Sequence, residues 1–178
     1  MTIPSQSFVP SAPAGVVFNP TQSFAGAQFI FAGEDGTISA WSSGAQATIK
    51  VDNSATAARY KALAIGNNGR ADLLYVTNVS ARTVDVFTDS FAPAPMPAGA
   101  FTDPKMPPGY APFAIQCIGG KIYVSFARQA EVVQDDTTGA DGGFVDIFDT
   151  NGALLERSMM RGMLNSPWGL ALAPMLAG

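Results

Sequence analysis

The sequence contains no histidine and a single cysteine, Cys117. Without histidine, Ser-His-Asp and Cys-His catalytic arrangements are excluded, as is any zinc or haem site with a histidine ligand. One cysteine excludes a disulfide within the chain. Only 10 of the 178 residues are Lys or Arg, and they are scattered. A nucleic-acid-binding surface, which needs clustered basic side chains, is therefore not expected.

Charged residues are also scarce, at 13%, whereas 47% of residues are hydrophobic. This composition argues against a disordered chain. No apolar run approaches the roughly 20 residues of a membrane-spanning helix. Residues 1–15 lack the basic start and apolar centre of a secretory signal. We expect a folded chain that is either soluble as given or the mature or partial form of an exported protein.

Alternation of apolar and polar residues dominates the sequence, and helical periodicity is weak. Short runs rich in β-branched and aromatic residues, bounded by Gly, Pro, Asn and Asp, predict strands. The expected strands are Gly15–Phe18, Gln28–Ala32, Thr37–Trp41, Ala47–Val51, Ala62–Ile65, Leu73–Thr77, Thr83–Thr88, Phe113–Cys117, Lys121–Ala127, Gly143–Asp149, Leu154–Arg157 and Gly169–Ala173. Single helical turns are predicted within Ala55–Lys61 and Gln129–Gln134.

Three strand motifs recur in the same order. The first reads Gly-Val-Val-Phe (15–18), Ala-Leu-Ala-Ile (62–65), Phe-Ala-Ile-Gln (113–116) and Gly-Leu-Ala-Leu (169–172). The second reads Phe-Ile-Phe-Ala (29–32), Leu-Tyr-Val-Thr (74–77) and Ile-Tyr-Val-Ser (122–125). The third reads Ile-Ser-Ala-Trp (38–41), Val-Asp-Val-Phe (84–87) and Val-Asp-Ile-Phe (145–148).

A repeat of roughly 50 residues with four strands is typical of β-propeller blades. The predicted fold class is therefore all-β, a partial propeller of four-stranded antiparallel blades at 15–54, 60–104 and 110–160, with one further strand at 168–174. The outer strand of the second blade is faint, near Ala98–Thr102. It adjoins a proline-rich insertion over 92–109, which is expected on the surface.

Several stretches carry a resemblance to a known family. They are Ala-Gly-Val-Val-Phe-Asn-Pro-Thr (14–21), Phe-Ala-Gly-Glu-Asp-Gly-Thr-Ile-Ser-Ala-Trp (31–41), Pro-Gly-Tyr-Ala-Pro-Phe-Ala-Ile-Gln (108–116) and Leu-Asn-Ser-Pro-Trp-Gly-Leu-Ala (164–171). In these motifs the chain resembles the central half of an uncharacterised bacterial family of exported β-propeller proteins, some of which carry a PEP-type sorting tag. The resemblance implies a propeller fold and export, and it implies no chemistry.

One face of such a propeller collects the loops that lead into the inner strands and the turns of the central hairpins, where functional residues tend to lie. The residues expected on that ligand-binding face are Glu34, Asp35, Asp52, Asn53, Tyr60, Lys61, Asn78, Arg82, Tyr110, Arg128, Asn165 and Trp168. This polar set with exposed aromatics suits a glycan, a peptide or another small ligand. The alternative interpretation of Gly33–Thr37 is an ordinary hairpin turn.

Three other features have both a functional and a structural interpretation. Asp135, Asp136 and Asp141 lie close enough in sequence to bind Ca²⁺, although their spacing does not fit an EF-hand and a solvated acidic loop is the favoured interpretation. Asp85 and Asp146 occupy one repeat position and are expected to bind an adjacent blade or loop. Cys117 is expected to be an inert core residue.

The predicted function is a non-catalytic binding or scaffold module, extracellular or on the cell surface, without a cofactor. One rival is a Ca²⁺-dependent propeller hydrolase or lactonase that uses Glu34 and Asp52; another is a truncated fragment without activity. Three blades leave two apolar faces uncovered. A second copy completes the ring by self-association, or Thr2–Pro10 closes it by pairing with Trp168–Ala173.

Overall fold

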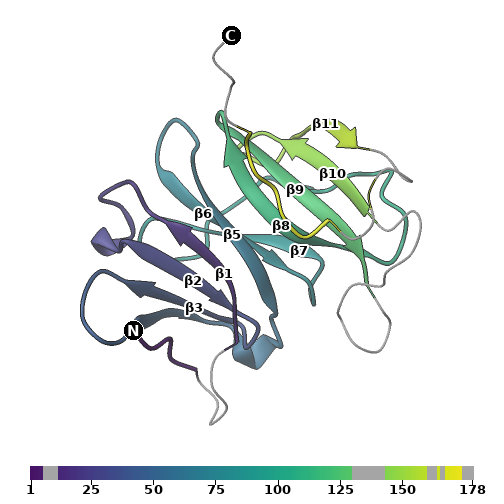
Figure 1. Cartoon of the computed structure of the whole chain (residues 1–178). Helices are drawn as coiled ribbons and strands as arrows, with labels where there is room; N and C mark the ends of the chain where they lie inside the picture. The colour runs from purple at the N-terminus through teal and green to yellow at the C-terminus, as the bar shows by residue number, and fades with distance from the viewer. Residues whose placement is uncertain (6–11, 130–142, 160–163, 165–166, 174–178) are drawn as a thin grey trace.

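The computed structural model describes residues 1–5, 12–129, 143–159, 164 and 167–173. Within them the chain is all-β and forms three antiparallel sheets, which lie side by side in chain order (Figure 1). The first sheet contains β1 (Pro13–Phe18), β2 (Phe29–Gly33), β3 (Thr37–Trp41) and β4 (Thr48–Asp52). The second contains β5 (Tyr60–Asn67), β6 (Asp72–Asn78) and β7 (Thr83–Phe87). The third contains β8 (Tyr110–Ile118), β9 (Lys121–Arg128), β10 (Gly143–Phe148) and β11 (Leu154–Met159).

Every predicted strand but one is present, with ends that differ by a few residues. The exception is Gly169–Ala173, which has no strand assignment, so that prediction is wrong. The turn predicted in Ala55–Lys61 is a short 3-10 turn at Ser54–Thr56, and Lys61 already belongs to β5. The turn predicted at Gln129–Gln134 lies outside the described residues after its first residue.

The second sheet lacks the outer strand expected near Ala98–Thr102. The chain after β7 pairs with it only around a single bridge between Phe87 and Pro93. Prolines at 93, 95 and 97 have no N–H to donate, so a regular ladder cannot continue along this edge. The proline-rich insertion also enters the interior, where Phe101 packs against Tyr75 and Phe148.

The three sheets share one register between their first two strands, which are β1 and β2, β5 and β6, and β8 and β9. We call β1, β5 and β8 the inner strands. Val16 pairs with Phe31, Leu63 with Val76 and Ile115 with Val124, and a bulge or irregularity precedes each pair. This register corrects the third occurrence of the first motif by one residue. Ala114, rather than Phe113, is equivalent to Gly15 and Ala62, because the irregularity in β8 lies just before Ile115.

Apolar side chains at alternate strand positions fill the two spaces between neighbouring sheets. Ile30 and Leu74 belong to the core between the first and second sheets, and both are fully buried. Tyr75 and Phe148 belong to the core between the second and third sheets. Burial of such side chains is the main stabilising contribution to the fold. No helix in the described ranges is long and apolar enough to cross a membrane.

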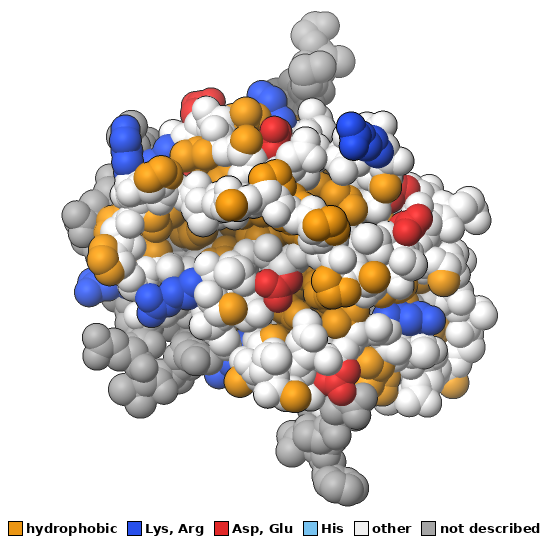
Figure 2. All heavy atoms as spheres, turned by 180° about the vertical axis from the view of Figure 1, so that it is seen from behind, with side chains coloured by type: hydrophobic (Ala, Val, Ile, Leu, Met, Phe, Trp, Pro, Cys, Tyr) orange, Lys and Arg blue, Asp and Glu red, His pale blue; other side chains and the backbone are white. Residues whose placement is uncertain are grey.

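Apolar side chains are also exposed at the surface. Seen from behind, hydrophobic side chains gather in an elongated hollow, with acidic and basic side chains around it (Figure 2). A groove of about 620 Å³ lies between the outer strand β11 and the loop at 103–107, with Leu154 and Leu155 on one side. The sheets therefore do not cover all of their own apolar surface.

Candidate functional site

The inner strands of the three sheets line one cavity of about 400 Å³. Its walls come from residues 14–17 of β1, 62–65 of β5 and 114–117 of β8, and the segment 168–170 completes them. These four segments overlap with the four occurrences of the first sequence motif. The repeat therefore marks the positions that converge on this inner-strand cavity.

A repeated hydroxyl contact places the C-terminal segment beside the third sheet. Thr77 Oγ1 accepts a hydrogen bond from the inner strand of its own sheet and donates one of 2.8 Å to the Phe113 carbonyl of the next. Ser125 is the equivalent residue in the third sheet, and its Oγ donates a 2.8 Å bond to the Pro167 carbonyl. The Pro167 carbonyl thus contacts the third sheet in the same way that the Phe113 carbonyl contacts the second sheet. The segment that follows Pro167 starts where a fourth inner strand would start.

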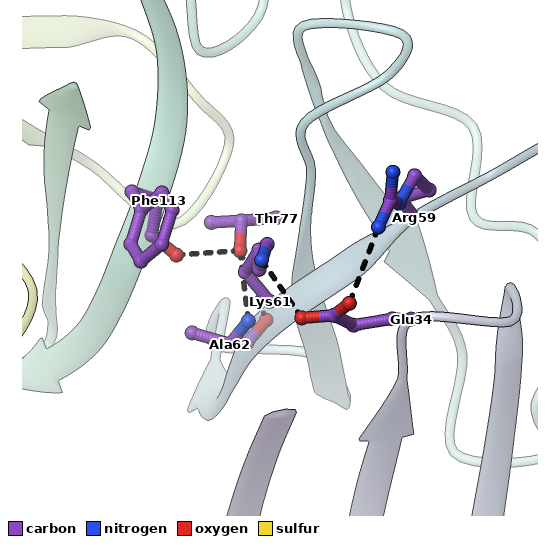
Figure 3. Close-up of polar contacts among 6 residues, drawn as sticks. All are labelled: Glu34, Arg59, Lys61, Ala62, Thr77 and Phe113. Carbon is purple, nitrogen blue, oxygen red and sulfur yellow. Dashed lines mark hydrogen bonds and ion pairs between the residues drawn. The ribbon is translucent and has the colours of Figure 1, made fainter. Parts of the chain in front are cut away.

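Three charged side chains meet beside this cavity, next to its lining residue Ala62 (Figure 3). Glu34, in the turn between β2 and β3, accepts hydrogen bonds from Lys61 Nζ at 2.8 Å and from Arg59 Nη2 at 3.2 Å. Partial burial acts to raise the pKa of Glu34, but the bonds and charges of Lys61 and Arg59 outweigh it and leave the pKa lowered. Glu34 is therefore held as a carboxylate.

The turn that presents Glu34 depends on Gly36. Gly36 has φ +80°, and a Cβ on it would lie 2.8 Å from the Ala58 carbonyl oxygen. Only glycine adopts this conformation without strain, and only glycine fits against the loop before β5. The interpretation of Gly33–Thr37 as a hairpin turn is confirmed, and this turn also positions a charged side chain at the cavity.

Aromatic rings lie next to the same charged side chains. Lys61 is almost completely buried, and its Nζ lies 5.4 Å from the centre of the Phe113 ring. The ring of Trp168 packs against Phe113 with centres 4.8 Å apart, and 60% of Trp168 is exposed. We call Glu34, Arg59, Lys61, Phe113 and Trp168 the cavity mouth. It combines a neutralised acid with an accessible indole.

A second polar network adjoins the mouth and is structural. The Tyr60 hydroxyl accepts a 2.7 Å bond from Asn53 and donates one of 3.2 Å to Asp85. Asn78 donates a further bond of 3.0 Å to Asp85. Burial, the larger effect, and the nearby Asp85 charge together raise the pKa of Tyr60, so Tyr60 stays protonated. Asp85 is a hydrogen-bonded strand acid as expected, but its partners lie in its own sheet and not in an adjacent blade or loop.

The other predicted site residues divide into three groups. Asp35 bonds Thr37 within its turn, Asp52 is exposed and bonds Ser54, and Arg82 and Arg128 are exposed at strand ends. Tyr110, expected as an exposed aromatic, is buried and packs edge to face against Phe144 at 4.8 Å. Asn165 and the candidate calcium ligands Asp135, Asp136 and Asp141 lie outside the described residues.

The sequence prediction missed Arg59 and Phe113. Each adjoins a residue that the repeat pattern did identify, but nothing in the sequence shows that Phe113 meets Lys61 from the neighbouring sheet. Cys117 lines the cavity, and burial raises the pKa of its thiol, as expected for an unreactive residue. The described residues contain no group of three or more Cys, Asp or Glu side chains that could hold a metal ion. Glu34 and Asp52, which the calcium hypothesis requires around one ion, have different partners.

Replacing Glu34 by Gln tests the ion pair at the mouth. We expect a loss of about 1 kcal/mol in the free energy of unfolding, because the buried Lys61 loses its ion pair with a carboxylate. Combining Glu34→Gln with Lys61→Met should recover part of that loss, and chemical denaturation of the single and double variants measures the coupling. Additive effects would contradict a direct interaction.

The fold and the mouth define an all-β protein of repeated antiparallel sheets with a cavity along their inner strands. No family model matches the chain. It is similar to three uncharacterised proteins of Acanthamoeba polyphaga mimivirus. The first is 33% identical over 111 residues, covering 60% of this chain and 28% of that protein. The second is 32% identical over 125 residues, covering 67% and 32%. The third is 27% identical over 183 aligned residues, covering 93% and 33%.

The chain therefore spans about a third of the length of these relatives. Each relative is described only as uncharacterised, and the similarity is distant. These comparisons assign no family, and the resemblance to a bacterial propeller family stays an expectation.

Proposed function

We propose that the three sheets are blades of an open β-propeller. Their common register, their side-by-side order and the convergence of β1, β5 and β8 on one cavity support this arrangement. Propellers contain roughly 4–8 blades around a central channel. On this proposal the inner-strand cavity is part of such a channel, and the segment after Pro167 begins a further blade.

We propose that the protein is a non-catalytic binding module whose ligand occupies the cavity mouth. The observation that carries the proposal is the grouping of an accessible indole that lines the cavity with a buried lysine and a carboxylate beside it. Ligand sites are typically concave, with apolar walls and a few oriented polar groups. This mouth has both features.

The chemistry of the mouth favours an uncharged ligand with one apolar face. Glu34 neutralises one of its two cationic partners, and Lys61 is itself almost completely buried. The flat face of Trp168 stacks on apolar ring surfaces, while Lys61 and Glu34 offer hydrogen bonds to hydroxyl groups. A sugar ring combines these two properties, so we infer a glycan ligand.

A panel of immobilised neutral glycans, followed by titration calorimetry, tests this function. We expect saturable binding that Trp168→Ala weakens at least about tenfold, since loss of an aromatic stacking partner costs more than 1 kcal/mol. Trp41→Phe serves as the matched control, because Trp41 lies on the first sheet and does not line the cavity. Binding that survives Trp168→Ala, or a panel without any saturable ligand, would refute the proposal.

A further inference from the structure

The outward face of the first sheet, which points away from the second sheet, carries an uncovered row of apolar side chains. Phe18, Phe29 and Trp41 lie opposite one another on β1, β2 and β3. The Phe29 ring contacts both others, with its centre 5.6 Å from that of Phe18 and 6.2 Å from that of Trp41. Phe18 and its neighbour on this face, Val16, are each 59% exposed. Large apolar side chains in such a contiguous row mark an interaction surface.

The same row is buried in the other two sheets. By register, the equivalents of Phe18, Phe29 and Trp41 are Ile65, Leu74 and Phe87 in the second sheet. These three side chains pack in the core against the first sheet. In the third sheet the equivalents are Cys117, Ile122 and Phe148, which pack in the core against the second sheet. The outward face of the first sheet thus carries apolar side chains at the positions that, in the other two sheets, pack against a neighbouring sheet.

The outward face of the third sheet, which points away from the second sheet, is the exposed face at the other end of the row of three sheets. Tyr123 and Val145 on this face line a hollow of about 400 Å³ together with the segment 167–172. That segment has no strand pairing, and its Leu172 is 71% exposed. In the first and second sheets, the face equivalent to this outward face packs against the next sheet along the chain. This face of the third sheet is therefore equivalent to faces that receive a sheet, and among the described residues the segment 167–172 lies against it instead.

We propose that the outward face of the first sheet in one copy of this chain binds the outward face of the third sheet in a second copy. The contact repeats the interfaces that already join the sheets within the chain. The row on the first sheet contains no charged side chain, whereas the outward face of the third sheet carries Lys121 on β9 and Glu156 opposite Ile147, so no like charges face each other. The incoming sheet displaces the segment 167–172, which includes Trp168, so this contact and the proposed glycan site exclude each other. Because the two faces differ, the interface is head-to-tail.

Sedimentation velocity over a range of protein concentrations tests the interface. We expect the wild type to associate reversibly and Phe18→Lys to associate at least about tenfold more weakly, because a lysine at this position prevents burial of a phenylalanine-sized apolar surface. Leu155→Lys is the control, since Leu155 is also a large apolar residue, 51% exposed, on the outer strand β11. The control should associate like the wild type.

Two results would overturn the interface. One is a wild type that stays monomeric at the highest concentration, and the other is an equal effect of Phe18→Lys and Leu155→Lys. Both variants replace exposed side chains, so circular dichroism should show that they fold. The two tests are distinguishable, because Phe18 belongs neither to the lining of the inner-strand cavity nor to the cavity mouth.

Discussion

The Arg157→Met variant is expected to lose about 3–5 kcal/mol of its free energy of unfolding near neutral pH, the usual cost of stranding a buried charge. Arg157 bonds two acids, Asp103 and Asp146, whose side chains are 3% and 0% exposed. Its guanidinium also lies 4.4 Å from the centre of the Phe144 ring. Removing it leaves both carboxylates buried without their cation. Urea denaturation of the variant and the wild type measures this loss.

The loss of unfolding free energy caused by Arg157→Met should become smaller as the pH falls. Burial raises the pKa of Asp146 to about 6, Arg157 acts to lower it, and Asp103 acts to raise it. A raised carboxyl pKa means that the folded state takes up a proton more readily than the unfolded state, so stability increases as the pH falls through that pKa towards the unfolded value of 3.8. Without Arg157 the pKa of Asp146 rises further, and protonation removes the stranded charge.

A second substitution and an exposed arginine provide the controls. Asp146→Asn in the Arg157→Met background should restore much of the lost stability, because it removes one stranded charge. Arg82→Met should change stability by less than about 0.5 kcal/mol, since Arg82 is exposed. A loss that is the same near pH 5 and near pH 7.5, or that Asp146→Asn does not reduce, would show that Arg157 acts through packing alone.

Replacing Thr77 by Val is expected to lower the free energy of unfolding by about 2–4 kcal/mol, because two backbone groups lose their hydrogen-bond partner inside the protein. Thr77 is fully buried, and its hydroxyl accepts the Ala62 N–H at 2.9 Å and donates to the Phe113 carbonyl at 2.8 Å. Valine has nearly the same shape but neither bonding capacity. For a chain of this size, such a loss lowers the Tm by roughly 10 °C, which scanning calorimetry detects.

Thr48→Val is the matched control for Thr77→Val, because Thr48 is an exposed strand threonine in the first sheet. We expect its Tm to change by no more than about 2 °C, as for most surface substitutions. Equal Tm values for Thr77→Val and the wild type would mean that the hydroxyl does not join the second and third sheets. The contact between Ser125 and Pro167 would then also lose its interpretation as a repeated docking bond.

Local patterns in the sequence predicted the strands because alternation, β-branched residues and turn residues act over a few positions. Gly15–Phe18 and Thr37–Trp41 were found this way. Gly169–Ala173 carries the same pattern but forms no strand, since a strand also needs a partner with which to pair its backbone. The second sheet stops at β7 for a similar reason, because the prolines that follow it cannot donate hydrogen bonds.

By itself, the sequence determined the all-β class, the repeat and the segments that line the cavity, because these depend on order and periodicity. Only the tertiary structure decided which polar residues act together. Lys61 meets Glu34 from the first sheet and Phe113 from the third, and Tyr110 is buried instead of exposed. Burial and hydrogen-bond partners arise between sheets that are distant along the chain, and no local pattern records which side chains those sheets bring together.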